Sequence, residues 1–390
     1  MSAFALTDEQ RAYVRQVREV ALAELVPLAE QGVEGRVNRP LLEAMGSHGL
    51  LSRLFGATGR SAAAMELCLL RETLATVCTD AETALALQAL GSYPFVLFGT
   101  GEQAGRYRDG VAAGTVVASF ALSEAEAGSD AAALGLRAEP DGDGWRLSGE
   151  KTWISNAPEA DVYTVFARTT AGARARGITA FVVAGSALGL TGEQLDMLAP
   201  HAIGRLVFDG VRVERADVLG EVDAGFKVAL RTLDVLRPSV GAFAVGMAQA
   251  ALDAAISHTT RRSAFGGVLS DQQAVSHLLA EMATRVEASR LLVYAAASAY
   301  DAGAPADLLT RQAAMAKLFA TESAQFVVDT AVQLHGARAL QRGHLLERLY
   351  RDVRAPRIYE GASEVQRTII GRSLVNSATN AGDPATRREG

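Results

Sequence analysis

The sequence of 390 residues predicts an α+β protein, mainly helical, in which a helical domain, a β-domain and a second helical domain follow one another. Three observations predict this order. Apolar residues recur at helical spacing in the first part, short strand-like runs begin near Gly114, and long helical patterns return near Gly225. The predicted parts are residues 1–115, 116–224 and 225–376, followed by a polar tail at 377–390 that we expect to be disordered.

The helical elements of the first part are separated by glycines and prolines. Thr7 and Gln10 have the spacing of a capping box, and the helix that they begin is expected to end at Pro27. Cys68 and Cys78 are expected to share one helix, where their separation corresponds to about 15 Å and excludes a disulfide. Further helical runs cover residues 41–50, 62–77 and 80–90, and another apolar segment opens at residues 93–95.

The middle part has the composition of short strands. The tetrapeptide Asp141-Gly142-Asp143-Gly144 is a strong hairpin signal between two of the runs. Strands at this spacing predict a compact β-domain, either a sandwich or a barrel. The runs are residues 116–122, 135–139, 145–148, 162–167, 178–183 and 206–208.

Long helices are predicted in the last part. Apolar residues at helical spacing form one face over residues 275–286 and another over 315–334. The second of these helices is expected to end at Gly336, because glycine suits the position after a helix. Residues 365–374 predict one more helix with a buried apolar face.

Composition and charge exclude several classes of protein. A net charge of −6 argues against nucleic-acid binding through a general electrostatic excess. Asp8 and Glu9 lie where a secretory signal would carry basic residues, and no uninterrupted apolar run has the length of a membrane span. We therefore expect a cytoplasmic protein. The histidines and cysteines show no His-x-x-His or Cys-x-x-Cys spacing, so metal catalysis is not expected.

Two stretches of the middle part have compositions that packing alone does not require. Residues 120–130 leave a strand for a loop of small and hydroxyl-bearing residues, where backbone can approach a polar ligand. Residues 149–156 place Trp153 and Ser155 two apart on a strand, so that both would face one side and address a planar ligand. An ordinary turn, and a core tryptophan beside a solvated serine, are the alternatives.

Two further stretches lie at helix ends in the last part. Residues 261–266 place an arginine at a helix-to-loop junction, where it could contact a phosphate, with Phe265 as a wall of the site. Residues 333–337 end a helix with polar side chains and a glycine that permits close approach. Each of these patterns is weak when taken alone.

A single carboxylate, Glu360, lies between Tyr359 and Gly361 just before the last helical run. Desolvation at the mouth of an apolar cavity raises the pKa of a carboxyl group toward neutrality, as a general base requires. The alternative is an exposed acid at a helix start, where the macrodipole favours negative charge.

Taken together and in this order, these stretches resemble the acyl-CoA dehydrogenase family over nearly the whole chain. Jointly the motifs are highly specific. They are Leu-Ser-Glu-x-x-Ala-Gly-Ser-Asp at 122–130, Gly-x-Lys-x-Trp-Ile-Ser-Asn at 149–156, Arg-x-x-Phe-Gly at 262–266, Gln-x-His-Gly at 333–336, Glu-Arg-Leu-Tyr-Arg-Asp at 347–352 and Ile-Tyr-Glu-Gly-x-Ser-Glu-x-Gln-Arg at 358–367.

The resemblance implies an N-terminal helical domain, a middle β-barrel or sandwich domain, a C-terminal four-helix bundle, and FAD as cofactor. Leu122 and Ser123 would lie near the pyrimidine end of the flavin, and Ser129 toward the pyrophosphate. Trp153 would pack on the isoalloxazine, and Ser155 would bond near flavin N5. The full implied FAD-binding set is Phe120, Leu122, Ser123, Ser129, Trp153, Ser155, Arg262, Phe265, Gln273, Gln333, Gly336, Ser363 and Glu364.

The resemblance also implies a homo-oligomer, more readily a tetramer than a dimer. In such an assembly one group of residues would reach the FAD of a neighbouring subunit, so that oligomerisation would complete the active site. That group is Arg262, Phe265, Gln273, Gln333 and Gly336.

Glu360 matches the family's catalytic base, which removes the α-proton of an acyl thioester while the β-hydrogen leaves as hydride to flavin N5. The backbone N–H of this glutamate and a flavin hydroxyl would hold the thioester oxygen. Some relatives carry the base at the position of Leu236, which cannot act as one. The substrate-binding residues that the resemblance implies are Ser129, Asp234, Arg237 and Gly361; a structural ion pair between Asp234 and Arg237 is the alternative.

The sequence also departs from the family pattern. Ala362 stands where a threonine commonly contacts FAD, and His258 stands where tyrosine is common. Residues 196–205 replace a basic, glycine- and serine-containing loop near the path of the thioester carrier. We interpret this loop as a hint of a specialised substrate, carried on an acyl-carrier protein instead of free CoA.

Three functions stay open at this stage. The first is an FAD-dependent α,β-dehydrogenase of acyl thioesters that passes electrons to an electron-transfer flavoprotein or a similar acceptor. The second is an oxidase of the same fold that reoxidises its flavin with oxygen. The third is a flavin-bearing relative that acts as a binding or scaffold protein.

Overall fold

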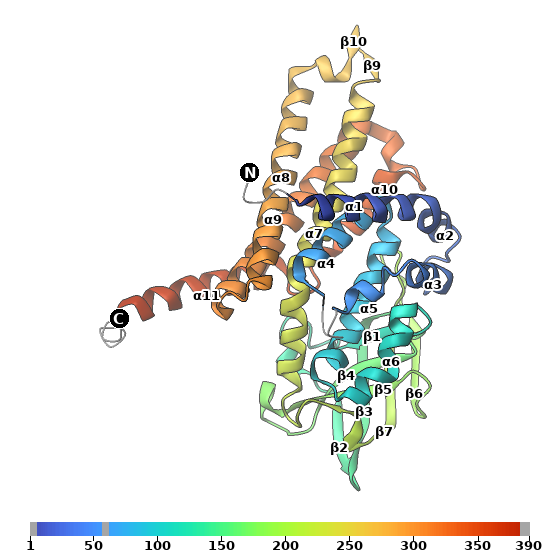
Figure 1. Cartoon of the computed structure of the whole chain (residues 1–390), viewed down its shortest axis with the longest axis vertical. Helices are drawn as coiled ribbons and strands as arrows, with labels where there is room; N and C mark the ends of the chain where they lie inside the picture. The colour runs from blue at the N-terminus through green and yellow to red at the C-terminus, as the bar shows by residue number, and fades with distance from the viewer. Residues whose placement is uncertain (1–5, 57–61, 383–390) are drawn as a thin grey trace. The chain divides into compact units, whose positions relative to one another are not determined.

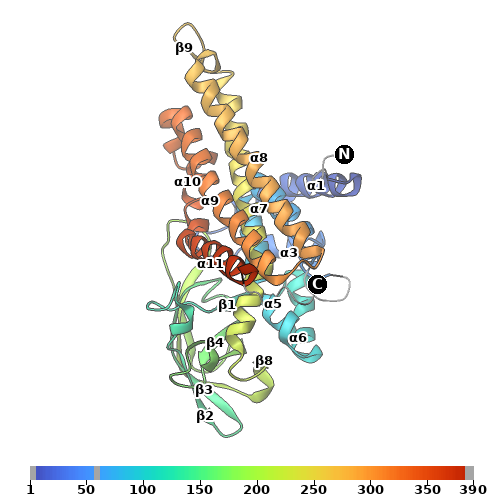
Figure 2. The same cartoon turned by 90° about the vertical axis from the view of Figure 1, so that its left-hand side faces the viewer.

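The computed structural model describes residues 6–56 and 62–382, with side chains described as far as residue 376. The chain folds as two compact units, one of residues 8–236 and one that begins at Arg237. Most elements of both units are labelled in Figure 1, and Figure 2 shows the same chain turned by 90°.

The first unit begins with helices, and the predicted end at Pro27 is wrong. A π-helical segment, Ala21–Leu25, continues α1, and Pro27 lies in the first turn of α2. The π-helical turn directly precedes the proline, with the N–H of Val26 donating to the carbonyl oxygen of Ala21, and the helical run continues past Pro27. The helices are α1 (Asp8–Val20), α2 (Val26–Glu30), α3 (Arg39–Ser47), α4 (Ala64–Val77), α5 (Thr79–Phe98) and α6 (Gly101–Ala113).

Two predictions around α5 are also wrong. Cys78 lies between α4 and α5, so it does not share a helix with Cys68, although both cysteines are buried and neither forms a disulfide in the described part of the chain. Residues 93–95 do not open a new segment, because α5 continues through Pro94 to Phe98. Burial explains this continuity, since Tyr93 and Phe95 are fully enclosed and their packing outweighs the hydrogen bond that a proline removes.

Eight strands join in one sheet in the order β6-β7-β3-β2-β4-β5-β8, with β1 pairing parallel to β4. The predicted hairpin is confirmed, because Asp141 pairs with Gly144 between β2 and β3. Two strands were not predicted from the sequence, namely β6, whose residues are mostly exposed, and the two-residue strand β8. The strands are β1 (Ala118–Ala121), β2 (Arg137–Asp141), β3 (Gly144–Ser155), β4 (Val162–Arg168), β5 (Ile178–Ala184), β6 (Leu190–Gln194), β7 (Ile203–Val213) and β8 (Val218–Leu219).

Helices and sheet of the first unit share one hydrophobic core. Phe95 of α5 and Val111 of α6 pack there with Phe166 of β4, and Val228, from the first turns of α7 (Gly225–Thr259), joins them. The aromatic ring of Phe120 at the end of β1 lies 4.8 Å from that of Phe166. The strand that leads into the first motif is therefore fixed to this core.

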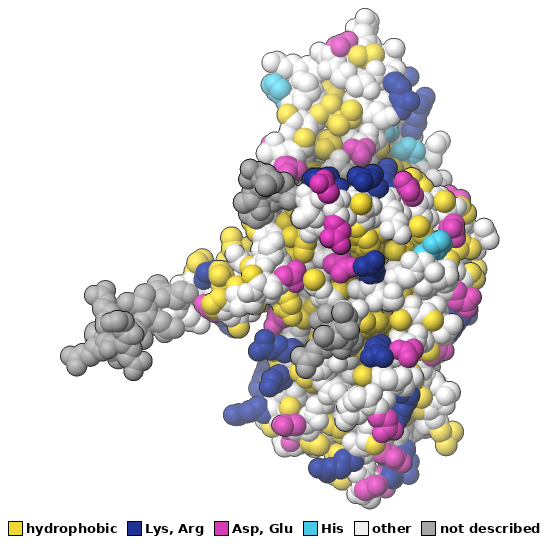
Figure 3. All heavy atoms as spheres, in the orientation of Figure 1, with side chains coloured by type: hydrophobic (Ala, Val, Ile, Leu, Met, Phe, Trp, Pro, Cys, Tyr) yellow, Lys and Arg dark blue, Asp and Glu magenta, His cyan; other side chains and the backbone are white. Residues whose placement is uncertain are grey.

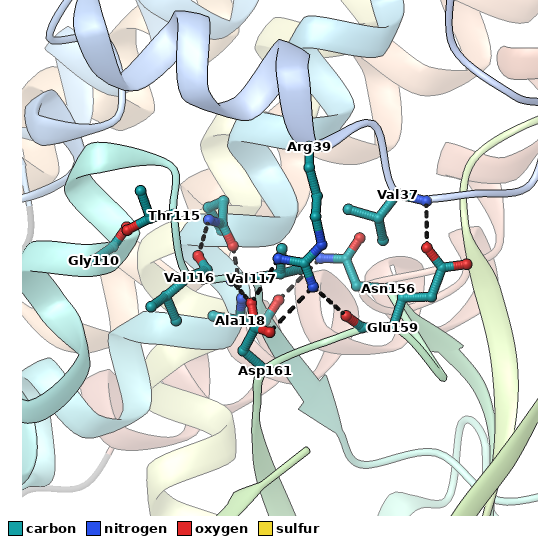
Figure 4. A network of polar contacts seen from close by, with 11 residues as sticks. Val37, Arg39, Gly110, Thr115, Val116, Val117, Ala118, Asn156, Glu159 and Asp161 are labelled. Carbon is teal, nitrogen blue, oxygen red and sulfur yellow. Dashed lines mark hydrogen bonds and ion pairs between the residues drawn. The ribbon is translucent and has the colours of Figure 1, made fainter. Parts of the chain in front are cut away.

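A polar network fixes the entry of β1 and is shown in Figure 4. Arg39 donates to both carboxylate oxygens of Asp161, at 3.0 and 3.1 Å, and to the carbonyl oxygen of Glu159 at 2.9 Å. Asp161 also accepts from the N–H of Val117 at 2.8 Å. The side chain of Asn156, at the end of β3, donates to the carbonyl oxygen of Ala118 at 2.9 Å (Figure 4). This network joins the start of β1 to the end of β3.

The second unit is helical. After the boundary, α7 runs on to Thr259, and a small β9–β10 hairpin follows it. Helix α9 packs against α8, α10 and α11. The elements are β9 (Ser263–Ala264), β10 (Gly267–Val268), α8 (Gln273–Asp301), α9 (Ala306–His335), α10 (Leu345–Asp352) and α11 (Ser363–Gly382).

The C-terminal ends of α9 and α11 can be compared with the predicted ends of these two helices. Helix α9 ends at Gly336, as predicted, with a φ of 64° and a ψ of −149° that only glycine adopts readily. Helix α11 continues beyond Ser377 to Gly382, so the predicted disorder does not begin at 377; residues 383–390 lie outside the described part. The predicted apolar face of α11 is only half-buried, and Leu374 is 56% exposed.

In the described residues, one helix has the length and composition of a membrane span, namely α7. Most of its apolar stretch is buried in the fold, which is typical of a core helix. This burial explains its composition without a membrane.

Asn156→Ala is expected to lower the free energy of unfolding of the first unit by about 2 kcal/mol. The change leaves the carbonyl oxygen of Ala118 without a buried donor, and alanine tolerates the φ of 64° at this position less well than asparagine. Asn156→Gly should lose less, because glycine adopts positive φ freely. Denaturant unfolding of both variants checks this, and unchanged midpoints would contradict the role of the network.

Candidate functional site

The first two motifs meet in the first unit. The N–H of Thr152, in β3, donates to the carbonyl oxygen of Ser123 at 3.1 Å. The hydroxyl of Ser119, in β1, donates to the carbonyl oxygen of Ser155 at 2.6 Å. The loop that follows β1 and the end of β3 are therefore adjacent, although the two motifs are separated in the sequence.

The buried residue Lys151 joins the loop after β1 to strand β3. Its side chain is fully buried, and its Nζ donates to the carbonyl oxygen of Leu122 at 2.9 Å and to Glu124 at 2.7 Å. Glu124 also accepts from the N–H groups of Gly135 and Leu136. Burial lowers the pKa of Lys151 to about 8, against the attraction of Glu124, which raises it. Sequence reasoning quoted this lysine within a motif but gave it no role.

Three of the predicted ligand-facing residues of this unit are accessible, whereas Leu122 is buried in the hydrophobic core. Ser123 is half-buried, Ser129 is exposed, and the indole of Trp153 is 47% exposed. Trp153 has a φ of 55° at a β-bulge between Lys151 and Ile154. The bulge interrupts the strand alternation from which we predicted that Trp153 and Ser155 face one side, so that argument does not hold at this point.

A pocket of about 440 Å³ in the same unit contains the predicted residue Asp234. Basic side chains of Arg176, Lys227 and Arg231 line it, together with Phe226. The sequence analysis missed these residues, although Lys227 and Arg231 are four apart on α7 and so share one face. The predicted partner Arg237 is buried, at 6% exposure.

The third and fourth motifs meet in a pocket of about 600 Å³ in the second unit. The rings of His258 and His335 stack with centroids 4.2 Å apart, and His344 lies edge-on to His335 at 5.6 Å. Arg338 and His344 were not predicted, and no motif pointed to them. The lining residues are Ser257, His258, Arg261, Arg262, Ser263, His335, Arg338 and His344.

This pocket is cationic because of its arginines. Burial lowers the pKa of His258, and the positive charges of neighbouring histidines and arginines lower it further. Burial also lowers the pKa of His335, against a hydrogen bond to the carbonyl oxygen of Ala331. Within the described residues, no group of three or more His, Cys, Asp or Glu side chains is arranged to hold a metal ion. The pocket therefore suits an anion.

The remaining predicted residues of the third and fourth motifs face outward. Phe265 is 91% exposed at the tip of the β9–β10 hairpin, with a φ of 55°. Gln273 is exposed at the start of α8, and Gln333 is exposed near the end of α9. These side chains do not line the pocket that contains Arg262.

Glu360 lies in a short loop before α11. Its φ is 49°, and that of Gly361 is 90°. The Oε2 atom of Glu360 is buried. Helix α9 holds the segment at both sides, because Glu322 accepts from Ser363 at 2.6 Å and pairs with Arg357 at 2.8 Å. The predicted residue Ser363 is buried, whereas Glu364 is exposed and pairs with Arg367.

Backbone strain coincides with the predicted site. In the described part of the chain, six residues other than glycine have positive φ, and three of them are predicted site residues: Trp153, Phe265 and Glu360. Such conformations carry about 1–3 kcal/mol of strain each, and they concentrate at ligand and active sites. The strained positions therefore favour a functional role for these three residues over ordinary packing.

A helical domain, a β-domain and C-terminal helices that carry these motifs define a flavin-dependent oxidoreductase. Residues 7–115, 119–211 and 223–375 match, in turn, the N-terminal, middle and C-terminal domains of acyl-CoA dehydrogenases. The chain belongs to the acyl-CoA dehydrogenase family. This confirms the predicted fold, the enzyme class and FAD as the cofactor.

Similar proteins cover almost the entire chain. The mitochondrial short-chain specific acyl-CoA dehydrogenase of Bos taurus is 38% identical over 95% of this chain and 91% of its own length. A probable acyl-CoA dehydrogenase of Mycobacterium tuberculosis is also 38% identical, over 95% of this chain and 97% of its own. The solved structure of butyryl-CoA dehydrogenase from Megasphaera elsdenii has a TM-score of 0.88 at 33% identity, covering 95% of this chain and 99% of that one.

The histidine pair should make stability depend on pH. Both pKa values lie below the ordinary 6.5, so the unfolded chain takes up protons that the folded chain does not as the pH falls through that value. Stability should therefore decline below about pH 6.5. His258→Tyr removes one of the two groups, and the decline in thermal midpoint from about pH 7.5 to about pH 5.5 should become shallower.

The exposed His277 on α8 provides the matched control, and His277→Gln should leave the pH dependence as it is in the unsubstituted protein. Burial lowers the pKa of His201 to about 4, so this residue contributes to the decline in every variant. Equal slopes for His258→Tyr and the unsubstituted protein would contradict a contribution from the stacked pair.

Proposed function

We propose that this protein dehydrogenates a short acyl-CoA to the trans-2-enoyl thioester, with Glu360 as the base that removes the α-proton. The observation that carries the proposal is the strained backbone of Glu360, at a φ of 49°, in a motif that matches the family's catalytic segment. Strain at a non-glycine residue persists only where the surroundings enforce it, and here the segment is tied to α9. A short acyl group is supported by the names of the short-chain and butyryl-CoA relatives.

The residues of the first unit fit a flavin. Trp153 offers an exposed aromatic face for a planar ring system, and the loop around Ser129 offers exposed backbone and hydroxyl groups for a polar chain. We assign cofactor binding in this unit to Phe120, Leu122, Ser123, Ser129, Trp153 and Ser155. Lys151 would keep the two motifs adjacent.

The cationic pocket of the second unit fits a diphosphate. Arg262 and the neighbouring arginines supply charge-assisted donors, and Gly336 keeps the end of α9 free of a side chain. We assign this pocket, with Phe265, Gln273 and Gln333, to the FAD of a second copy of the chain. Ser363 and Glu364 are assigned to FAD binding on motif match alone.

A homo-oligomer follows from that assignment, and exposed apolar side chains support it. Hydrophobic side chains are visible among the C-terminal helices in Figure 3. On α8 and α9, Leu278, Leu291, Met315 and Phe319 are between 36% and 42% exposed. Large apolar residues on neighbouring helices are typical of a surface that is covered by another subunit. We propose a tetramer as the assembly.

In the reaction, the carboxylate of Glu360 takes the α-proton, and its backbone N–H is proposed to hold the thioester oxygen, where charge develops. When bound, FAD supplies the acceptor for the hydride that leaves the β-carbon. Leu236, at the rival base position, is a buried hydrocarbon and takes no proton. Gly361 keeps space beside the base free of a side chain.

We propose CoA as the carrier of the acyl group. The pocket that contains Asp223 and Asp234 also has three basic side chains and Phe226, which suit phosphates and an aromatic base. Ser129 and Arg237 are assigned to the substrate with Asp234. The acyl-carrier protein is the alternative carrier. An electron-transfer flavoprotein is the proposed acceptor, and we propose the cytoplasm as the location.

Glu360→Gln is expected to slow the bleaching of bound FAD by butyryl-CoA, mixed without oxygen, by about 10²–10⁴-fold, because the variant lacks a general base. Rapid-mixing absorbance measures this rate. Glu281→Gln is the control, since Glu281 forms an exposed pair with Arg285 on α8 and should leave the rate unchanged. Both variants should keep their yellow colour.

Three outcomes would count against parts of this proposal. Steady oxygen consumption with substrate and no added acceptor would favour an oxidase over a dehydrogenase. Unchanged bleaching by Glu360→Gln would remove Glu360 from the role of base. FAD that is bound but not bleached by any acyl thioester would support a binding protein.

A further inference from the structure

The loop that carries Glu360 adopts a conformation that its own residues do not favour. Glu360 has a φ of 49° and Gly361 a φ of 90°. A side chain at Gly361 would place its Cβ 2.4 Å from Nε2 of Gln366. The left-handed conformation costs a residue such as glutamate about 1–2 kcal/mol. Neighbouring groups must therefore hold the loop.

Two buried side chains hold it through its carbonyl groups. Nζ of Lys317, from α9, donates to the carbonyl oxygens of Tyr359 at 3.2 Å and Gly361 at 2.7 Å. Nε2 of Gln366, from α11, donates to the carbonyl oxygens of Glu360 at 3.3 Å and Gly361 at 2.9 Å. Three consecutive carbonyl groups thus accept hydrogen bonds from two side chains that are both fully buried.

Burying the ammonium group of Lys317 costs desolvation free energy that an apolar side chain would not cost. Lys317 is fully buried, and in the described part of the chain it forms no ion pair within 4.0 Å. Burial of a charge is strongly disfavoured, and methionine would fill the same volume without that penalty. The charge at this position is therefore better explained by the loop that it contacts than by packing.

We propose that Lys317 is a positioning residue for the catalytic base, holding the carbonyl groups on both sides of Glu360 and favouring its ionised carboxylate. This inference rests on the proposed role of Glu360. The hydrogen bond to the carbonyl group of Tyr359 fixes the peptide plane that contains the N–H of Glu360. The positive charge attracts the carboxylate and so opposes its protonation.

The charges around Lys317 are mixed. Burial lowers the pKa of Lys317 to about 8, Glu360 raises it, Arg237 lowers it, and Glu322 and Glu364 raise it. The attraction between Lys317 and Glu360 is reciprocal, so it favours the charged form of each. Below about pH 8 the ammonium is present, and above that value the loop keeps a neutral donor without the charge.

The test compares Lys317→Met with Gln366→Met, using FAD-loaded protein and butyryl-CoA. Each variant removes hydrogen bonds to the same loop, but only the first removes a charge. We expect the bleaching rate of both to fall by about tenfold or more, with the affinity for butyryl-CoA changed by less than about threefold. Only Lys317→Met should move the acid limb of the rate profile upward, by about one pH unit. Lys317→Gln, which keeps one donor without the charge, replaces Lys317→Met if that variant does not fold, and the same upward shift is expected.

Three results would overturn the inference. The first is a normal rate and pH profile in Lys317→Met. The second is an equal shift of the acid limb in both methionine variants. The third is a loss of thermal stability and substrate affinity with no change in the profile. Failure of the base assignment would appear separately, as unchanged bleaching by Glu360→Gln.

Discussion

The first unit depends on the buried ammonium group of Lys151. Its Nζ bonds the carbonyl oxygen of Leu122 and the carboxylate of Glu124, and this contact fastens the loop after β1 to strand β3. Two motifs that are distant in sequence become neighbours because of it. In the second unit, the buried ammonium group of Lys317 likewise fixes a loop, but it bonds two carbonyl oxygens of the Glu360 loop and no carboxylate. Both lysines are fully buried, and burial lowers the pKa of each to about 8.

A buried lysine can satisfy the carbonyl groups of a loop that has no regular secondary structure. Loops that approach a ligand closely leave carbonyl groups and strained residues that cannot be stabilised by a regular helix or sheet. A lysine supplies several donors on a long stem, so it can satisfy such carbonyl groups from a neighbouring element. The buried ammonium group costs desolvation free energy. This cost is tolerated where the charge stabilises the local structure. On α9, Lys317 stabilises the strained loop of Glu360 in this way.

Much of the fold was predictable, because hydrophobic spacing and hairpin chemistry are local signals. The hairpin at Asp141–Gly144 and the end of α9 at Gly336 are confirmed, as is the family from its motifs. The errors arise where tertiary packing overrides local signals. Pro27 and Pro94 are typical of helix boundaries in a sequence. In the structure, Pro27 lies within α2 and Pro94 lies inside α5. Strand β6 is mostly exposed and gave no apolar pattern.

The candidate site was only partly predictable for the same reason. Trp153, Arg262 and Glu360 could be predicted from sequence motifs, because their residue types carry recognisable chemistry. Arg338 and His344 enter the cationic pocket through tertiary structure alone, since no spacing relates them to Arg262. Lys317 lies 43 positions before Glu360, and only the fold of α9 beside the loop reveals the contact.

The central claim is that bound FAD and Glu360 act together on an acyl thioester. Product analysis after anaerobic mixing of the FAD-loaded protein with butyryl-CoA tests it most directly. We expect trans-2-butenoyl-CoA to appear in an amount equal to the flavin reduced. Reduction of the flavin without the enoyl product, or a bound flavin that no acyl-CoA or acyl-carrier-protein thioester reduces, would contradict it.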